Sequence, residues 1–291
     1  MSAQAAAGQG PWRQAWVRLR AHRAAMASLA LLSLLLAAAC LVPMLSRYDY
    51  VTPNWDAMFA APGTLPTHWL GTDALGRDLL VRLMWGVRIS LLVGVAASVI
   101  SVLIGVLWGA TSGYAGGAVD ALMMRTVDVL YCIPFIPLVI MLTVLFGRHF
   151  LLVFVAIGAV SWLDVARIVR GQTLSLKHRE FIVAAQTLGL SRRAMIGRHF
   201  VPNLLGVVVI YATLTIPAVI LFEAFLSFLG LGVQAPLASL GSLVAEGASG
   251  MQSHPYLLIV PSGVLALIIF CFSFLGDGLR DALDPRDGSG R

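Results

Sequence analysis

Six long apolar stretches run along the chain, separated by short polar segments or by loops that carry charge. A bilayer core about 30 Å thick needs about 20 predominantly apolar residues per helix, and each stretch meets that length. The pattern therefore predicts an all-α membrane protein with six transmembrane helices. They are expected at 24–45, 89–111, 126–146, 150–169, 204–229 and 256–275.

Pro134, Pro137 and Pro217 lie inside the predicted spans. Neighbouring helices can satisfy the carbonyls that a proline leaves without a donor, so we expect kinks rather than breaks. The first stretch contains "LAAAC", which is typical of a lipoprotein cleavage site. A segment of over twenty residues precedes the stretch, and the apolar run continues past Cys40. These features favour a retained helix, with a cleaved signal peptide as the alternative.

The composition agrees with a membrane protein. Of the 291 residues, 59% are hydrophobic and 12% are charged, whereas soluble domains carry about 25% charged residues. The net charge of +6 is spread between the apolar runs instead of gathering on one polar face, so no nucleic-acid partner is expected. Cys40, Cys132 and Cys271 lie in apolar stretches without CxxC spacing, so we expect neither a metal site nor a disulfide.

The distribution of basic residues predicts the orientation. If the N-terminus is cytoplasmic, fifteen arginine and lysine residues lie on the cytoplasmic side and five lie outside. Cytoplasmic loops of membrane proteins carry an excess of these residues. Both termini are therefore expected in the cytoplasm, with an N-terminal segment at 1–23, a first transmembrane helix within 24–46, an external loop at 47–88 and a tail at 281–291.

The loop between the fourth and fifth spans, "HREFIVAAQTLGLSRRAMIGRHFVPN" (178–203), has the pattern of two short helices. Gly189 is placed to end the first helix, Ser191 to cap the second, and Pro202 fits the first turn of the next span. Phe181, Ala184, Ala185 and Leu188 share one face of the first helix, and small alanines on an exposed turn would let a partner approach closely. Docking to a cytoplasmic protein is the preferred interpretation. An interfacial helix on anionic lipid is the alternative.

The segment "VAAQTLGLSRRAMIGRHFVPN" resembles the EAA loop of bacterial ABC importer permeases. Ala184, Ala185, Gly189 and the pair Val201–Pro202 match its pattern, whereas Val183 stands at the position of the family's glutamate and Glu180 lies a turn away. In this family the loop forms a coupling helix that sits in a groove of the ATPase subunit. The resemblance implies a coupling loop at 171–203 whose contact residues are Glu180, Phe181, Ala184, Ala185, Gly189, Arg192, Arg193, Arg198 and Pro202.

Four further blocks resemble the dipeptide/oligopeptide/nickel branch of these permeases, and its C-type peptide subunit most closely. They lie at 68–94, 113–138, 226–236 and 276–286. The resemblance implies the type I importer fold, with a five-helix core at 89–280, in a bacterial inner membrane. The implied substrate is a di- or oligopeptide. The implied partners are a homologous second permease, two cytoplasmic ATPase subunits, an external solute-binding protein and membrane lipid.

The chain lacks the G-x-x-x-x-G-K-[ST] loop that cradles nucleotide phosphates, because its only lysine, Lys177, is followed by histidine. We therefore expect no enzyme activity and no cofactor on this chain, with ATP and Mg²⁺ bound by partner subunits. Alternatives are the same machine carrying nickel, glutathione or another small solute, and a self-sufficient secondary transporter. An internal inverted repeat would favour a secondary transporter, but the sequence shows no such repeat.

Carboxylates inside the predicted spans are the remaining candidates, since such groups are costly in a membrane and usually functional. Glu223 and Asp128 are candidates for the translocation pathway or for a subunit interface. For Glu223 a contact with a helix backbone or with the second permease is an equal alternative. Asp128 can instead pair with Arg125 three residues earlier. Asp164 and Arg167 have the same spacing.

The external loop at 47–88 is rich in tyrosine, tryptophan and proline. An aromatic belt at the membrane interface is the preferred interpretation of this loop. The alternative is a surface that meets the substrate-delivery protein.

Overall fold

The computed structural model describes residues 11–147 and 150–283, and the regular elements among them are helices. The elements are α1 (Pro11–Ala21), α2 (Arg23–Leu45), the short 3₁₀ turn Trp55–Ala57, α3 (Leu79–Ala115), α4 (Gly117–Tyr131), α5 (Phe135–Phe146), α6 (Phe150–Lys177), α7 (Glu180–Thr187), α8 (Arg192–Met195), the π-helical turn Ile196–Phe200, α9 (Val201–Phe228), α10 (Leu240–Ser249) and α11 (Tyr256–Leu283).

Four helical segments of the described chain are long and apolar enough to cross a membrane. They are Arg23–Leu45, Leu79–Ala115, Arg193–Phe228 and Tyr256–Leu283. The bent pair α4 and α5 would make a fifth span if the two helices are taken together. The predicted span at 150–169 lies within α6, which continues beyond it to Lys177. The all-α membrane architecture is confirmed, and the count of six spans remains a prediction.

The second long helix begins ten residues earlier than the apolar pattern predicts. Asp78 caps α3, because its side chain accepts a hydrogen bond of 2.8 Å from the backbone N–H of Val81. The external loop therefore ends at Asp78, and Arg82 and Arg88 lie inside the helix. The predicted boundary at 88 was wrong because both arginines find partners within the chain: carboxylates for Arg82 and backbone carbonyls for Arg88.

The expectation of a kink at Pro134 was wrong, because the helix breaks there. The helix α4 ends at Tyr131, α5 begins at Phe135, and the two axes are bent by 78°. Proline disfavours the helical conformation at the residue before it, so Ile133 and Pro134 end one helix and begin the next. Pro137 lies in the first turn of α5 rather than within a longer helix, and α9 continues through Pro217 without a break.

A row of glycines on α3 brings α6 into close contact. Gly105, Gly109 and Gly113 recur every four residues, on one face of the helix. A Cβ at Gly109 would lie 2.4 Å from the carbonyl oxygen of Ala166, and one at Gly105 would lie 2.6 Å from Cβ of Val165. Small residues in such rows let transmembrane helices approach closely where no hydrophobic driving force exists between them. α3 and α6 therefore form the closely packed centre of the bundle.

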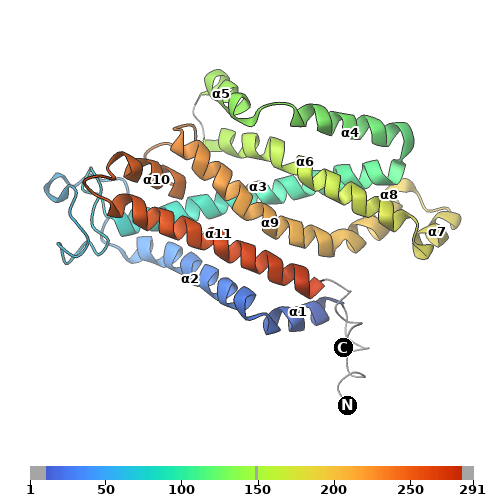
Figure 1. Ribbon diagram of the computed structural model, residues 1–291, viewed down its shortest axis with the longest axis horizontal. Coiled ribbons are helices and arrows are strands. Elements are labelled where there is room, and N and C mark those ends of the chain that lie inside the picture. Colours follow the sequence, from blue (N-terminus) through green and yellow to red (C-terminus); the bar gives the residue numbers. More distant parts are fainter. Residues whose placement is uncertain (1–10, 148–149, 284–291) are drawn as a thin grey trace, which may run out of the picture.

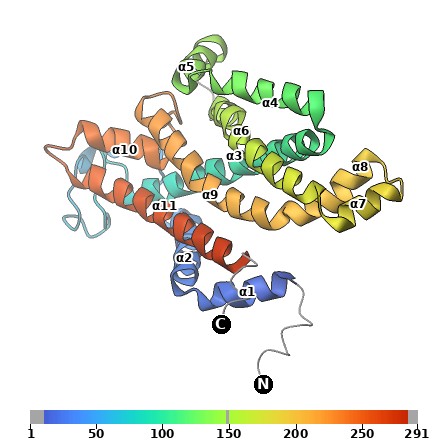
Figure 2. The same ribbon diagram turned by 45° about the vertical axis from the view of Figure 1, so that its right-hand side comes forward.

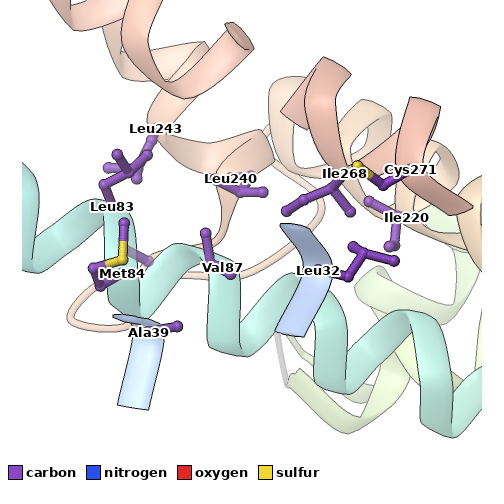
Figure 3. Close-up of a cluster of buried hydrophobic side chains, with 11 residues drawn as sticks. Leu32, Ala39, Leu83, Met84, Val87, Ile220, Leu240, Leu243, Ile268 and Cys271 are labelled. Carbon is purple, nitrogen blue, oxygen red and sulfur yellow. The ribbon is translucent and has the colours of Figure 1, made fainter. Parts of the chain in front are cut away.

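The half of the bundle that contains α10 is held by an apolar cluster drawn from five helices. Leu32 and Ala39 of α2, Met84 and Val87 of α3, and Ile268 of α11 belong to it, and its other buried members include Leu83, Ile220, Ala238, Leu240, Leu243 and Cys271. Figure 3 shows the side chains from these separate helices converging beside α3. The short helix α10 is thus part of the packed core.

The two ends of the bundle differ. Figure 1 shows α10 and the loop before α3 at one end, and α7 and α8 at the opposite end. In Figures 1 and 2, α4 and α5 lie on the side of α6 that faces away from α2 and α11. α1 packs on the last turns of α11, where Leu19, Ala25 and Ala282 are buried together.

Candidate functional site

The segment 178–203 forms a hairpin of two helices, α7 and α8, and α8 continues through the π-helical turn into α9. α7 ends at Thr187, and Gly189 has a φ of +77° with its N–H donating to the carbonyl oxygen of Gln186. Glycine adopts this left-handed conformation without the steric cost that other residues meet. The Ser191 hydroxyl accepts a hydrogen bond of 3.3 Å from the N–H of Ala194. Pro202 lies in the first turn of α9. The predicted turn at Gly189 and the predicted cap at Ser191 are confirmed, whereas the expectation of a separate second short helix was wrong, because one helical segment runs from Arg193 to Phe228.

One face of this hairpin is buried against the nearby ends of three long helices. Ile182, Ala185, Met195 and Phe200 are buried with Val106 and Ala110 of α3, Val165 and Val169 of α6, and Leu204 of α9. The expectation that Ala185 lies on the exposed face was therefore wrong, because it shares the buried side of α7 with Ile182. A displacement of the hairpin must consequently move the ends of three long helices.

Among residues 11–147 and 150–283, nothing covers the opposite face of the hairpin. Leu188 is 80% exposed, and Phe181 and Val183 are about half exposed. The remaining predicted contact residues Glu180, Ala184, Gly189, Arg193, Arg198 and Pro202 are exposed as well, and the side chain of Arg192 lies outside the described residues. The hairpin presents an apolar patch with basic residues beside it, which suits a protein partner that has an apolar groove and nearby carboxylates.

A second ionic group, which the sequence analysis missed, lies near the same end of the bundle. Arg170 of α6 donates two hydrogen bonds, of 2.5 and 2.6 Å, to the carboxylate of Asp120 on α4, which also accepts a hydrogen bond from Ser112 of α3. Lys177 donates to the backbone carbonyl oxygen of Tyr114 at 3.0 Å. The spacing of these residues along the chain gives no signal of their proximity. The group links the inner ends of α3, α4 and α6 near the hairpin.

Asp128 takes part in a network between α4 and α6, with a different partner from the one predicted. Arg167 donates to its carboxylate at 2.8 Å, and the guanidinium lies 4.2 Å from the ring centre of Tyr131. Tyr131 donates a hydrogen bond to Asp164. The predicted pairings of Asp128 with Arg125 and of Asp164 with Arg167 were wrong, because each carboxylate reaches across to the neighbouring helix.

Glu223 lies inside the chain, with none of its surface exposed. Its carboxylate accepts hydrogen bonds from Ser90 of α3 at 3.0 Å and from Ser227 one turn later at 2.7 Å. The Ser90 hydroxyl oxygen in turn accepts from the N–H of Leu240 at the start of α10. Glu223 was expected at the translocation pathway or at a subunit interface. It lies instead inside the chain, where serine donors of the same chain satisfy its carboxylate. Its observed role is to join α3, α9 and α10.

The end of the bundle that carries α10 holds a network of four charged residues. Arg82 is 2% exposed and donates to Asp73 at 2.5 Å and to both carboxylate oxygens of Glu246 at 2.7 and 2.9 Å. Arg77 donates to Asp73 at 2.7 Å. A cavity of about 440 Å³ adjoins these side chains and is otherwise lined mainly by apolar residues of the loop, α10 and α11. The network fastens the external loop and α10 to the start of α3.

The aromatic residues of the external loop make specific contacts. The rings of Tyr48 and His68 are in tilted contact, with ring centres 4.4 Å apart, and the ring of Tyr50 lies at the same distance from Trp85. Trp55 and Trp69 remain largely exposed. Among the described residues, no group of three or more His, Cys, Asp or Glu side chains is arranged to hold a metal ion.

Comparison with known proteins identifies the family to which the chain belongs. Residues 101–287, which include the hairpin, match the family described as binding-protein-dependent transport system inner membrane components. The chain belongs to this family. Residues 10–62 also match the N-terminal transmembrane domain of oligopeptide transport permease C. The chain is thus a multi-pass bacterial inner-membrane permease, and its α7–α8 hairpin is the family's EAA loop.

Three relatives illustrate how far the similarity extends. The permease is 55% identical to the oligopeptide transport system permease protein OppC of Escherichia coli strain K12 over 280 residues, which cover 96% of this chain and 93% of the relative. Identity to OppC of Haemophilus influenzae is 51%, over 96% and 90% of the two chains. The dipeptide transport system permease protein DppC of Bacillus subtilis is 42% identical, over 94% and 85%.

Proposed function

We propose that this permease is one of two homologous membrane subunits of an ATP-driven importer that moves di- or oligopeptides across the inner membrane. The observation that carries the proposal is the hairpin, whose buried face joins three long helices while its other face is uncovered. The relatives named as oligopeptide and dipeptide permeases support the substrate class. Nickel, glutathione or another small solute is the alternative cargo of the same machine.

The partners follow from what this chain lacks and what it presents. The sequence contains no nucleotide-binding loop, so ATP and Mg²⁺ belong to two cytoplasmic ATPase subunits that dock on the apolar patch of Phe181, Val183 and Leu188. An external solute-binding protein delivers the peptide at the end that carries α10. Six spans and two cytoplasmic termini, with α7–α8 on the same side, complete the proposed arrangement.

In the proposed mechanism, this chain transmits movement of the ATPase subunits to its long helices. When the ATPase subunits close on ATP, they move α7 and α8, and the buried contacts of Ile182 and Phe200 pass that movement to α3, α6 and α9. Because closely packed helices move as rigid bodies, a shift at the inner ends changes which end of the pathway is open. The chain itself carries out no covalent chemistry.

The test uses the complete importer in proteoliposomes, with the second permease, both ATPases and the binding protein. Uptake of a labelled tripeptide is expected to require ATP and to continue when an ionophore collapses ion gradients. Leu188→Asn is expected to lose most ATP-coupled uptake, whereas Val17→Asn, an exposed apolar position on α1, is the matched control. Loss of uptake with the ionophore alone would indicate a secondary transporter. ATP-driven uptake of nickel or glutathione, without peptide uptake, would make the proposed substrate wrong.

A further inference from the structure

The network of Asp128, Tyr131, Asp164 and Arg167 is exposed on the surface of the isolated chain. The side chains of Asp128 and Arg167 are 53% and 45% exposed, and Asp164 and Tyr131 are also exposed. The residues lie on α4 and α6, with one ion pair and one hydroxyl–carboxylate hydrogen bond crossing between the two helices. In the assembled transporter this network must therefore face lipid, another protein or water.

The network lies at membrane depth. α6 has 28 residues, and Asp164 and Arg167 lie at least about 15 Å from either end along the helix axis. The apolar core of a bilayer is about 30 Å thick, so both residues fall within it. Exposed ionised groups at this depth cost several kcal/mol against lipid and face a protein or a water-filled cavity instead. Lipid is therefore excluded as the neighbour of this face.

A second feature occurs at the same place. α4 ends at Tyr131, and the chain turns by 78° before α5 begins. Figure 1 shows this break about halfway along the bundle. The end of a helix carries a partial negative charge from its last carbonyl groups, and broken helices near the midplane form cation and substrate sites in transporters.

The charges of the network do not cancel. Arg167 pairs with Asp128, whereas the contact described for Asp164 is with the uncharged Tyr131 hydroxyl. One carboxylate therefore remains in excess beside the negative end of α4. The next charge on α4, Arg125, lies about 4.5 Å further toward the cytoplasmic end. The outer side of the network, next to the break, is thus electronegative.

We propose that Asp164 and the end of α4 line the translocation pathway and bind the amino terminus of the peptide as it passes. The ammonium group of a peptide has the positive charge and the hydrogen-bond donors that an excess carboxylate accepts, and the partial negative charge at the end of α4 attracts the same group. Arg167 holds Asp128 in an ion pair, so the charge of Asp164 is not compensated by an arginine within the network. This proposal rests on the proposed peptide-importing function and adds the place of contact.

Cys132 provides a reporter of water and charge at this position, because it follows Tyr131 directly and is exposed. The complete importer with Cys40→Ser would be treated with two membrane-impermeant thiosulfonate reagents of similar size, one cationic and one anionic. We expect labelling of Cys132, with the cationic reagent favoured by about tenfold after correction for intrinsic reactivity. Asp164→Asn should reduce this preference severalfold. Cys132→Ser gives the background from the buried Cys271, and Leu34→Cys in that variant reports an exposed position on α2 expected to face lipid.

Uptake supplies the second measurement. Asp164→Asn keeps an acceptor for Tyr131 but removes the charge, and we expect it to lower uptake of a tripeptide by about tenfold while ATP hydrolysis stimulated by the binding protein continues. Asp164→Glu should retain most uptake. Failure of Cys132 to react both in the resting and in the ATP-trapped importer would place the second permease on this face and overturn the proposal. Equal labelling by both reagents would overturn it too.

The two proposals can be separated in the same preparation. If the unmodified importer takes up no peptide with ATP, the proposed function fails. If it does and Asp164→Asn matches it in uptake, only the binding of the amino terminus fails.

Discussion

Arg82 in the first turn of α3 and Glu246 on α10 form a two-pronged ion pair between residues that are 164 positions apart in the sequence, with N–O distances of 2.7 and 2.9 Å. Paired N–H···O bonds of this kind fix geometry as well as supplying energy. The pair connects the beginning of the central helix to the short outer helix. Its arginine is buried while its carboxylate is half exposed.

We predict that Glu246→Gln destabilises the outer end of the permease by about 1–2 kcal/mol. Glutamine can accept only one of the two hydrogen bonds, and the buried guanidinium keeps Asp73 as its remaining carboxylate partner. The midpoint of thermal unfolding of the purified importer should fall. Asp56→Asn is the control, because Asp56 is exposed on the external loop that also contains Asp73. Equal shifts in the two variants would contradict the role of the ion pair.

The hairpin gives a second prediction, at Gly189. A Cβ at this residue would meet no atom within 4 Å, so any effect of substitution arises from the φ of +77°. Holding another residue there costs about 1–2 kcal/mol, which would shift the turn and displace Leu188. Gly189→Val should leave the protein inserted but lower ATP-coupled uptake. Gly189→Asn should retain more uptake, since asparagine tolerates this conformation.

Gly197 offers the matched control for that experiment. It lies in the same hairpin, a Cβ there also meets no atom within 4 Å, and its backbone is helical. Gly197→Val should therefore leave uptake nearly unchanged. If the Gly189→Val and Gly197→Val variants lose uptake equally, the backbone conformation of Gly189 is not what the hairpin requires.

The helical and capping features could be predicted from the sequence because they depend on neighbours along the chain. The turn at Gly189, the cap at Ser191 and the apolar length of α9 are of this kind. The start of α3 was missed because Arg82 and Arg88 interrupt the apolar pattern, and their partners lie on α10 and α2. When a distant segment supplies the partner of a charged residue, the sequence around that residue does not show it.

The candidate site shows the same limit. The exposed contact residues of the hairpin follow from helical periodicity, but Ala185 was misplaced because the side of α7 that packs on α6 depends on the tertiary fold. Asp128 was assigned the nearest arginine in sequence, whereas helix packing brings it to Arg167. Glu223 was expected at a surface because its donors, Ser90 and Ser227, could not be recognised as neighbours before folding.

The topology gives a third prediction. Ala61 and Ala184 are exposed on the external loop and on α7 respectively, whereas the neighbouring Ala185 is buried. Single cysteines at these two sites, in a background without Cys40 and Cys132, should react with an impermeant reagent from opposite sides of the membrane. Labelling of both from one side would contradict the proposed orientation.

The fourth prediction concerns Glu223. Glu223→Gln keeps the shape and an oxygen acceptor, and serine hydroxyls can rotate to accept from its amide, so assembly and uptake should be largely retained. Glu223→Leu leaves the hydroxyls of Ser90 and Ser227 without their carboxylate in a buried site, at a cost of about 1–3 kcal/mol. The yield of assembled importer and its unfolding temperature should fall. Selective loss of transport by Glu223→Gln, with normal assembly, would mean that the charge itself guides substrate.

The last prediction follows from the proline in α2. Pro43 has no N–H, so the carbonyl oxygen of Ala39, four residues earlier, lacks its usual helical donor. Arg88 of α3 supplies the missing hydrogen bond through Nε and donates a second one, of 2.6 Å, to the carbonyl oxygen of Cys40. The guanidinium thus repairs the break that the proline makes in the hydrogen-bond ladder of its neighbour.

If this account is correct, Arg88 and Pro43 are energetically coupled. Arg88→Met should destabilise the permease by about 1–2 kcal/mol, because it leaves the Ala39 carbonyl without a donor inside the membrane. Pro43→Ala provides a backbone N–H for that carbonyl, so Arg88→Met should cost about half as much or less in its presence. A double-mutant cycle on unfolding of the purified importer measures the difference. Additive effects would show that Arg88 serves α2 in some way unrelated to the proline.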